Sequence, residues 1–341
     1  MTGMGKEKTI FKMLTYALNW NLGLCQKKLI LYEATDIYGI ALICIGALAS
    51  VISIILYVDT LITVIHSASS KEKGCTAFIL SVYPVTCLVS YFAIIVPRSH
   101  LLCEALTQGM FMTGMYQLFC LFVSYCGGDA QLVKQVKPNE LSMKVGPCCC
   151  WPCCSLLPTL KMEKKIVKCL KLLVLQLPVV QGLVYFIILV MWAEAESLYE
   201  INYLYLQPII IISIIFGIWG MLMTINLLKT TLDSSFLLFH KFIVLQMVLV
   251  LAKIQGIIAR MLVWYDVFPC KPPVTPQVYA NLIHNTLMIM EMVILGCIAR
   301  NLYKRKVPEI CKKSINGVIN TVFSGSLPHV NNNNNEHKES M

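Results

Sequence analysis

Charged residues are scarce in this chain. Only 13% of its 341 residues are Asp, Glu, Lys or Arg, whereas a soluble domain has about 25%. Hydrophobic residues make up 57% of the sequence, and the mean hydropathy is +0.70. A chain of this length with so little charge cannot cover itself with a surface that faces water. We therefore predict a polytopic membrane protein.

Motifs for catalysis are also missing. The sequence has no Gly-x-Ser-x-Gly elbow, no His-Glu-x-x-His motif and no phosphate-binding loop. Its 6 histidines are scattered. We therefore predict that the protein is not an enzyme and needs no cofactor. The net charge of +10 does not indicate nucleic-acid binding, because the basic residues lie in loops and the tail, where membrane topology explains them.

What the sequence does contain is seven long apolar segments, each able to cross a bilayer about 30 Å thick. They lie at about 37–65, 75–96, 101–126, 166–192, 204–228, 236–263 and 277–302. The predicted fold class is all-α, with seven transmembrane helices in one domain over residues 37–306. Residues 1–36 form a separate N-terminal segment. The polar residues 307–341 are predicted to be a disordered tail.

The distribution of Lys and Arg predicts the orientation. Basic residues gather in the loop 127–165, in the tail and in the first loop, whereas the stretch 193–203 has three glutamates and no Lys or Arg. By the positive-inside rule the N-terminal segment is extracellular, and the loop 127–165 and the tail are cytosolic. The lysines of residues 1–36 oppose this orientation. The loop 127–165, the tail and the first loop agree with it, and we give these three regions more weight.

A dense cysteine run lies in the loop 127–165. Its members are Cys148, Cys149, Cys150, Cys153 and Cys154. Five thiols in seven positions are too crowded for one tetrahedral metal site, and the loop has no histidine to complete one. A redox role would need a βαβ context that is absent. We therefore predict no metal site.

Two interpretations of the cysteine run remain open. Juxtamembrane cysteines close to basic residues such as Lys161, Lys164 and Lys165 are typical of S-acylation sites. Each buried CH₂ group contributes about 0.8 kcal/mol, so two or more acyl chains would hold the loop against the inner leaflet. Alternatively, the cysteines, Trp151 and the neighbouring prolines form a simple apolar patch at the interface.

Polar side chains recur on the last two spans. Gln246, Lys253 and Arg260 are spaced seven apart and share one helix face, as do His284 and Glu291. The short loop between these spans predicts antiparallel neighbours, with Lys253 within reach of Glu291. Two hypotheses stay open: a polar stripe that faces substrate, or an ion pair between Lys253 and Glu291 that lets both helices insert.

Further charges lie near the ends of other spans. Arg98 could bind an anionic head group of a lipid, the favoured interpretation, or of a substrate. Glu104 could pair with Arg98 or cap a vestibule, and Asp59 is expected to reach interfacial water. The candidate substrate-binding residues are Arg98, Glu104, Gln246, Lys253, Arg260, His284 and Glu291.

Several motifs, taken in order, resemble those of the alpha subunit of organic solute transporters. They are Pro97-Arg98-Ser99 with Glu104, Gly127-Gly128, Gly146-Pro147 with the cysteine run, Gln246 and Gln255, Cys270-x-Pro272-Pro273, and Glu291 followed by Tyr303-Lys304-Arg305-Lys306. The resemblance covers roughly residues 37–306. The cysteine run is its most specific part.

The resemblance implies facilitative transport of amphipathic organic anions, such as bile acids and conjugated steroids, across the cell membrane. It also implies a single-span beta subunit as partner, within a bilayer whose lipids surround the spans. An apolar surface would take the steroid body, and Lys253, Arg260 or Arg98 would meet the acid group.

A seven-span receptor or sensor without transport activity is the alternative. The third span ends in Ser124-Tyr125-Cys126 rather than in Asp/Glu-Arg-Tyr, the seventh lacks Asn-Pro-x-x-Tyr, and the seventh span has no lysine for a retinal. A trafficking or scaffold protein is a third possibility. Measurable flux separates the transporter from both.

Overall fold

The computed structural model describes residues 37–67, 70–135, 140–142, 145, 159–161, 163–194, 196–229, 232, 236–265, 267 and 276–304. The N-terminal segment 1–36, the tail 307–341 and the cysteine run lie outside these residues. The predictions of domain boundaries, of a disordered tail and of acylation therefore stay predictions.

Among the described residues, seven helices are long and apolar enough to cross a membrane, which confirms the predicted spans and a multi-pass membrane protein. They are α2 (Ile37–Ser67), α3 (Ser70–Ile95), α4 (His100–Tyr125), α7 (Lys164–Glu194), α8 (Glu196–Lys229), α9 (Leu238–Trp264) and α10 (Pro276–Lys304). The largest difference is the start of α8, eight residues before the predicted 204. The first residues of α8 include Glu196 and Glu200, which are too polar for the bilayer core but can still be helical. The apolar part of the helix begins at Tyr205.

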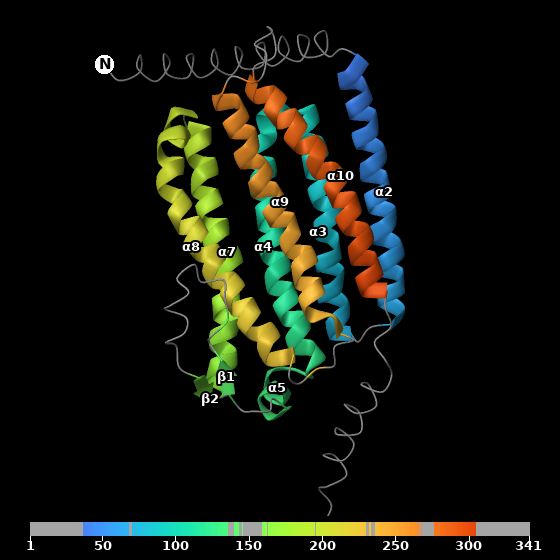
Figure 1. Cartoon of the computed structure of the whole chain (residues 1–341), viewed down its shortest axis with the longest axis vertical. Coiled ribbons are helices and arrows are strands. Elements are labelled where there is room, and N and C mark those ends of the chain that lie inside the picture. The colour runs from blue at the N-terminus through green and yellow to red at the C-terminus, as the bar shows by residue number, and fades with distance from the viewer. Residues whose placement is uncertain are drawn as a thin grey trace, which may run out of the picture. The chain divides into compact units, whose positions relative to one another are not determined.

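Four short elements join the spans. The 3₁₀ helix η1 (Pro97–Ser99) connects α3 to α4, and α5 (Asp129–Gln135) follows α4. Strand β1 (Glu140–Ser142) pairs antiparallel with β2 (Thr159–Lys161), with Leu141 opposite Leu160. We call the end of the helices near α5, β1 and β2 the sheet end, and the opposite end the Pro97 end (Figure 1).

Helices α3 and α4 lie at the centre of the bundle. Helix α3 packs against α2 and α10, and α4 packs against the α7–α8 pair (Figure 1). Helix α9 lies on α10 and also contacts α4. Side chains such as Ile79, Met112 and Phe122 are fully buried in this core, whereas Leu48 and Phe186 on the outer helices are more than half exposed. Exposed apolar faces are expected where lipid is the solvent.

Small residues set how closely α7 and α8 approach. A Cβ atom added to Gly217 would lie 2.3 Å from Cγ of Leu177, and one added to Gly220 would lie 3.0 Å from Cδ2 of Leu173. Glycines let helix backbones come close in membranes, where packing rather than hydrophobic exclusion drives association. The glycine pair of α8 therefore fixes the position of α7, which contributes to the site described below.

The double glycine after α4 ends that helix. Gly127 and Gly128 have φ values of +83° and +102°, which favour glycine. The Gly127 N–H donates to the Ser124 carbonyl (2.9 Å) and the Gly128 N–H to the Val123 carbonyl (3.1 Å), the two bonds of a Schellman motif. Cys126 beside them is 1% exposed, and burial raises the pKa of its thiol to about 12.

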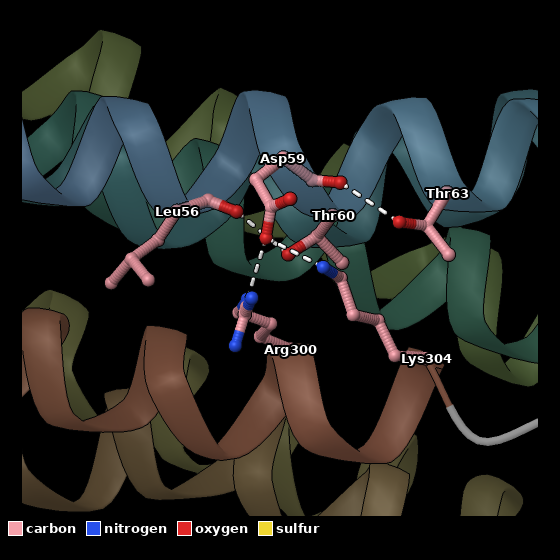
Figure 2. A network of polar contacts seen from close by, with 6 residues as sticks. All are labelled: Leu56, Asp59, Thr60, Thr63, Arg300 and Lys304. Carbon is pink, nitrogen blue, oxygen red and sulfur yellow. Dashed lines mark hydrogen bonds and ion pairs between the residues drawn. The ribbon is translucent and has the colours of Figure 1, made fainter.

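An ionic network joins the first and last spanning helices near the sheet end (Figure 2). Asp59 Oδ2 of α2 accepts bonds from Arg300 Nε (2.7 Å) and Lys304 Nζ (2.6 Å) of α10. The Thr60 and Thr63 hydroxyls donate to carbonyls of their own helix and not to the network. Asp59 is 46% exposed, so the carboxylate expected to meet water also has two cationic partners on α10.

Candidate functional site

Three polar side chains from three helices meet toward the Pro97 end. Lys253 Nζ of α9 lies 3.1 Å from Glu104 Oε1 of α4, and the Tyr185 hydroxyl of α7 lies 3.3 Å from both atoms. Lys253 is 11 residues from Trp264, the last residue of α9, or about 16 Å along the axis. The contact therefore lies well inside the membrane-spanning part of the helices.

The packing of the helices explains why these groups meet. Helix α4 packs against both α7 and α9. The Tyr185 ring is 6% exposed, in an apolar cluster with Leu101, Val184, Ile188 and Ile210. Its hydroxyl donates to the Glu104 carboxylate and accepts a hydrogen bond from Lys253. The cluster thus presents one polar atom to the ion pair.

The ion pair is not sealed inside the bundle. The Lys253 side chain remains 33% exposed and that of Glu104 31% exposed. Arg260 and His284 interact electrostatically with Glu104, and His284 also interacts with both cations. We call these five residues, Glu104, Tyr185, Lys253, Arg260 and His284, the Glu104 cluster. Counting Lys253 and Arg260 as positive, Glu104 as negative and His284 as neutral gives it a net charge of +1.

His284 adds a further polar atom to the cluster. Its Nδ1 is buried and has no hydrogen-bond partner among the described residues. A buried polar atom of this kind usually has a protein or water partner in a complete environment. An entering polar group could therefore bond to it.

Of the two hypotheses left open for these residues, the ion pair between Lys253 and Glu291 is not the one that the structure forms. Lys253 faces α4 and pairs with Glu104, while Gln255, two residues on and about 200° around the helix axis, faces α10. Gln255 Nε2 donates a hydrogen bond to Glu291 Oε1. Helices α9 and α10 do pack together as expected, but the polar residues that meet between them differ from those predicted. Glu104 forms its ion pair with Lys253.

The other candidates lie apart from these contacts. Arg98 is exposed on η1 at the Pro97 end. Gln246 lies seven residues before Lys253 on α9, or about 10 Å closer to the sheet end. Its Oε1 atom is buried without a hydrogen-bond partner in the described part of the chain. The structure thus unites four of the seven candidates and adds Tyr185, whose position in an apolar helix gave no signal in the sequence.

A second lysine of α9 has different surroundings, which the sequence analysis missed. Lys241 is 5% exposed, and its Nζ donates to the Tyr125 hydroxyl over 2.9 Å. The same atom lies 4.9 Å and 5.0 Å from the ring centres of Tyr125 and Tyr303. We call this arrangement the Lys241 cage. The aromatic residues come from α4 and α10, so no local pattern in the sequence could reveal it.

Metal binding finds no support in the part of the chain that the structure describes. No group of three or more His, Cys, Asp or Glu residues there could hold a metal ion. The cysteine run is not among those residues.

Comparison with known proteins decides the family. Residues 40–307 match the family model described as organic solute transporter Ostalpha. The chain belongs to the organic solute transporter alpha family. This is a transporter family and not an enzyme family, as the sequence predicted. The match runs from α2 to just beyond α10 and includes every residue of the Glu104 cluster.

Curated relatives agree with this assignment. The organic solute transporter alpha-like protein of Drosophila melanogaster is 25% identical over 281 residues, which cover 81% of this chain and 83% of the relative. The organic solute transporter subunit alpha of Danio rerio is 22% identical over 280 residues, covering 81% and 85%. That of Leucoraja erinaceus is 23% identical over 265 residues, covering 75% and 74%. The comparison with solved structures gave no match.

Proposed function

We propose that this member of the family is a facilitative transporter of amphipathic organic anions, with sterol-derived acids such as bile acids and conjugated steroids as its substrate class. The observation that carries the proposal is the Glu104 cluster. It combines a surplus positive charge, a position within the spans and an ion pair that stays about one third exposed.

The charge balance supports an anionic substrate. A cation at the bilayer centre costs about 2.5–3.5 kcal/mol on insertion scales unless it is paired or hydrated. Glu104 neutralises one of the two charges supplied by Lys253 and Arg260. A sulfate or carboxylate would supply the second negative charge, and His284 Nδ1 could take part in a hydrogen bond to it.

The apolar surroundings support an amphipathic body. The apolar cluster around the Tyr185 ring continues into partly buried apolar side chains of α7 and α8, among them Trp192, Leu206 and Ile214. Ligand sites commonly combine a large apolar surface with few polar groups that fix orientation. A steroid skeleton beside α7 and α8 would place its acid group at Lys253.

We assign different roles to the remaining candidates. Arg98, exposed at the Pro97 end, is the first basic contact for an approaching anion. Gln246 lies closer to the sheet end and offers a hydrogen bond further along the path. Glu291 does not bind substrate in this proposal, because its carboxyl group faces Gln255 and accepts a hydrogen bond from it.

The proposal includes a partner and a membrane. Two of the relatives are named as subunits, which supports a single-span beta subunit that this chain needs for surface delivery and activity. We place the complex in the cell membrane, with the Pro97 end outside and the basic sheet end in the cytosol. The five cysteines of the run would add acyl anchors at the inner leaflet.

Uptake of a labelled bile acid or steroid sulfate tests the function. Cells express this chain alone, with a candidate single-span partner, or with an empty vector, and surface protein is quantified in each case. We expect saturable uptake that requires the partner and does not change when sodium is replaced or ATP is depleted. Surface protein without any flux would instead favour the receptor or sensor.

A further inference from the structure

A second polar contact within the membrane lies between α9 and α10. Gln255 Nε2 donates a hydrogen bond to Glu291 Oε1. The other two oxygens of these groups, Gln255 Oε1 and Glu291 Oε2, are buried and have no hydrogen-bond partner among the described residues. Glu291 lies 15 residues after Pro276 and 13 before Lys304, in the middle of α10. The contact is therefore remote from the water at either end.

The two unpartnered oxygens identify what is missing. An ionised carboxylate only accepts hydrogen bonds, so it offers nothing to the carbonyl oxygen of the amide. A carboxylic acid protonated on Oε2 becomes a donor. Because both groups are planar, a carboxylic acid and a primary amide can close a ring of two hydrogen bonds, N–H to Oε1 and O–H to the amide oxygen. One proton would therefore satisfy both orphaned atoms.

The charged groups of the neighbouring elements are engaged elsewhere. Helix α10 packs against α2, α3, α9 and η1. On α2, Asp59 holds Arg300 and Lys304. On α9, Lys253 pairs with Glu104 and Arg260 also interacts with it.

The remaining titratable groups of these helices lie toward the ends or are neutral. Lys241 of α9 is held in its cage, and Glu72 and Lys73 begin α3. Arg98 lies on η1 at the Pro97 end. Tyr83 of α3 is a buried phenol. His284, seven residues before Glu291 on the same face of α10, interacts with Glu104, Arg260 and Lys253. An ionised Glu291 would thus be a carboxylate in the membrane without a cationic partner among the described residues, which is unfavourable.

We propose that Gln255 and Glu291 form a proton-binding site in which Glu291 crosses the membrane as a neutral carboxylic acid. The proton sits on Oε2 and is donated to Gln255 Oε1. Glu104 on α4 is the contrasting case, because its carboxyl group has a cationic partner in Lys253. The proposal concerns a different pair of residues from the Glu104 cluster and does not depend on which solute is transported.

Labelling with dicyclohexylcarbodiimide tests the proposal, because this apolar reagent reacts with protonated carboxyl groups in membranes. The full chain, with its partner if one is required, is labelled in liposomes at several pH values and the modified peptides are quantified by mass spectrometry. We expect the adduct at Glu291 to exceed that at Glu104 by on the order of tenfold or more at pH 7, since each unit between two midpoints changes the protonated fraction tenfold. The yield at Glu291 should fall as the pH rises.

Two variants serve as controls. Glu291→Gln should abolish the adduct and leave surface level unchanged, because an amide pair keeps the hydrogen bonds. Gln255→Lys places a cation beside Glu291 and should remove the adduct while Glu291 remains. Difference infrared spectra provide a second readout: the carbonyl band of a protonated acid should be present in the parent protein and absent in Glu291→Gln.

Each result of these experiments either supports or overturns the proton site. A pH-dependent adduct at Glu291, or the infrared band alone, supports the proton site. Absence of both overturns it, as does equal labelling of Glu104 and Glu291. Protection by sodium at constant pH would identify a metal cation in place of the proton and would also overturn it. None of these readouts uses solute flux, so failure of the transport proposal would leave them unaffected.

Discussion

Lys253 and Lys241 lie on the same helix and each donates a hydrogen bond to a tyrosine hydroxyl, but their other surroundings differ. Lys253 is one third exposed and meets a carboxylate. Lys241 is 5% exposed and meets two tyrosine rings and a hydroxyl. The first lysine can exchange its partner without any helix moving. The second is held between side chains of α4 and α10.

Under the proposed function, Lys253 serves binding at one end of α9 and Lys241 serves stability at the other. An ion pair that water reaches contributes about 0.2–1 kcal/mol, so if water enters the proposed site, replacing Lys253 should cost the fold little. A desolvated cation–π contact contributes about 2 kcal/mol, and Lys241 makes two. The predictions below test whether the two lysines can be separated in this way, beginning with the largest effect.

Replacing Lys241 should damage the fold. Lys241→Ala removes both ring contacts and the hydrogen bond to Tyr125, and leaves a cavity between three helices. We expect a loss of about 2–4 kcal/mol in the free energy of unfolding. Thermal unfolding of the purified chain in detergent and its surface level in cells measure the effect. Lys253→Ala is the matched control on the same helix and should lose less than about 1 kcal/mol; equal losses would break the comparison.

Replacing Lys253 should instead damage flux. Lys253→Ala removes the cation closest to the proposed anion site, and the loss of one such contact, about 1.4 kcal/mol, corresponds to a tenfold change in binding. We expect uptake of a steroid sulfate to fall by about tenfold at a surface level within about twofold of the parent. Lys253→Arg keeps the charge and should retain most of the flux. A parallel fall in flux and surface level would reduce Lys253 to a structural ion pair.

Removing the carboxylate of the pair should change affinity in the opposite direction. Glu104→Gln raises the net charge of the Glu104 cluster by one and releases Lys253 from its competing partner. We expect the KM for an organic anion to fall severalfold, since a nearby surplus charge favours anion binding. The concentration dependence of uptake measures this. A KM that rises would show that Glu104 positions the anion site and does not compete with the solute for it.

Thiol labelling sharpens the contrast between an accessible and a sealed region. Cys126, close to the Lys241 cage, is buried and its pKa is about 12, so at pH 8 only about one thiol in ten thousand is the reactive thiolate. In a Lys253→Cys variant, the new thiol takes the place of a side chain that is one third exposed. Treatment with maleimide should modify position 253 and leave Cys126 intact, as read by peptide mass. Modification of Cys126 at a similar rate would show that the sheet end opens.

The spans were predictable from composition, but their partners were not. Hydropathy located all seven helices, because lipid-facing and core positions are both apolar. The seven-residue spacing correctly placed Gln246, Lys253 and Arg260 on one face of α9, but a single helix carries no information about which neighbour that face meets. The partner of Lys253 comes from α4, 149 positions away in the sequence.

Aromatic partners were harder still to foresee. Tyr125, Tyr185 and Tyr303 are ordinary residues in apolar helices until packing brings their hydroxyls or rings to a lysine. The strands β1 and β2 are three residues each, too short for an alternating pattern to register. Lys241, near the start of its span, resembles an interfacial lysine by position alone.

The contact between Asp59 and the last turn of α10 has a mechanical consequence. It ties the first spanning helix to the last, so the two ends of the seven-helix region are fastened to each other and neither is a free edge. A force applied at either end must disrupt the same interface before any helix can leave the bundle. We therefore expect α2 and α10 to be extracted together, as one step, when the chain is pulled from the membrane.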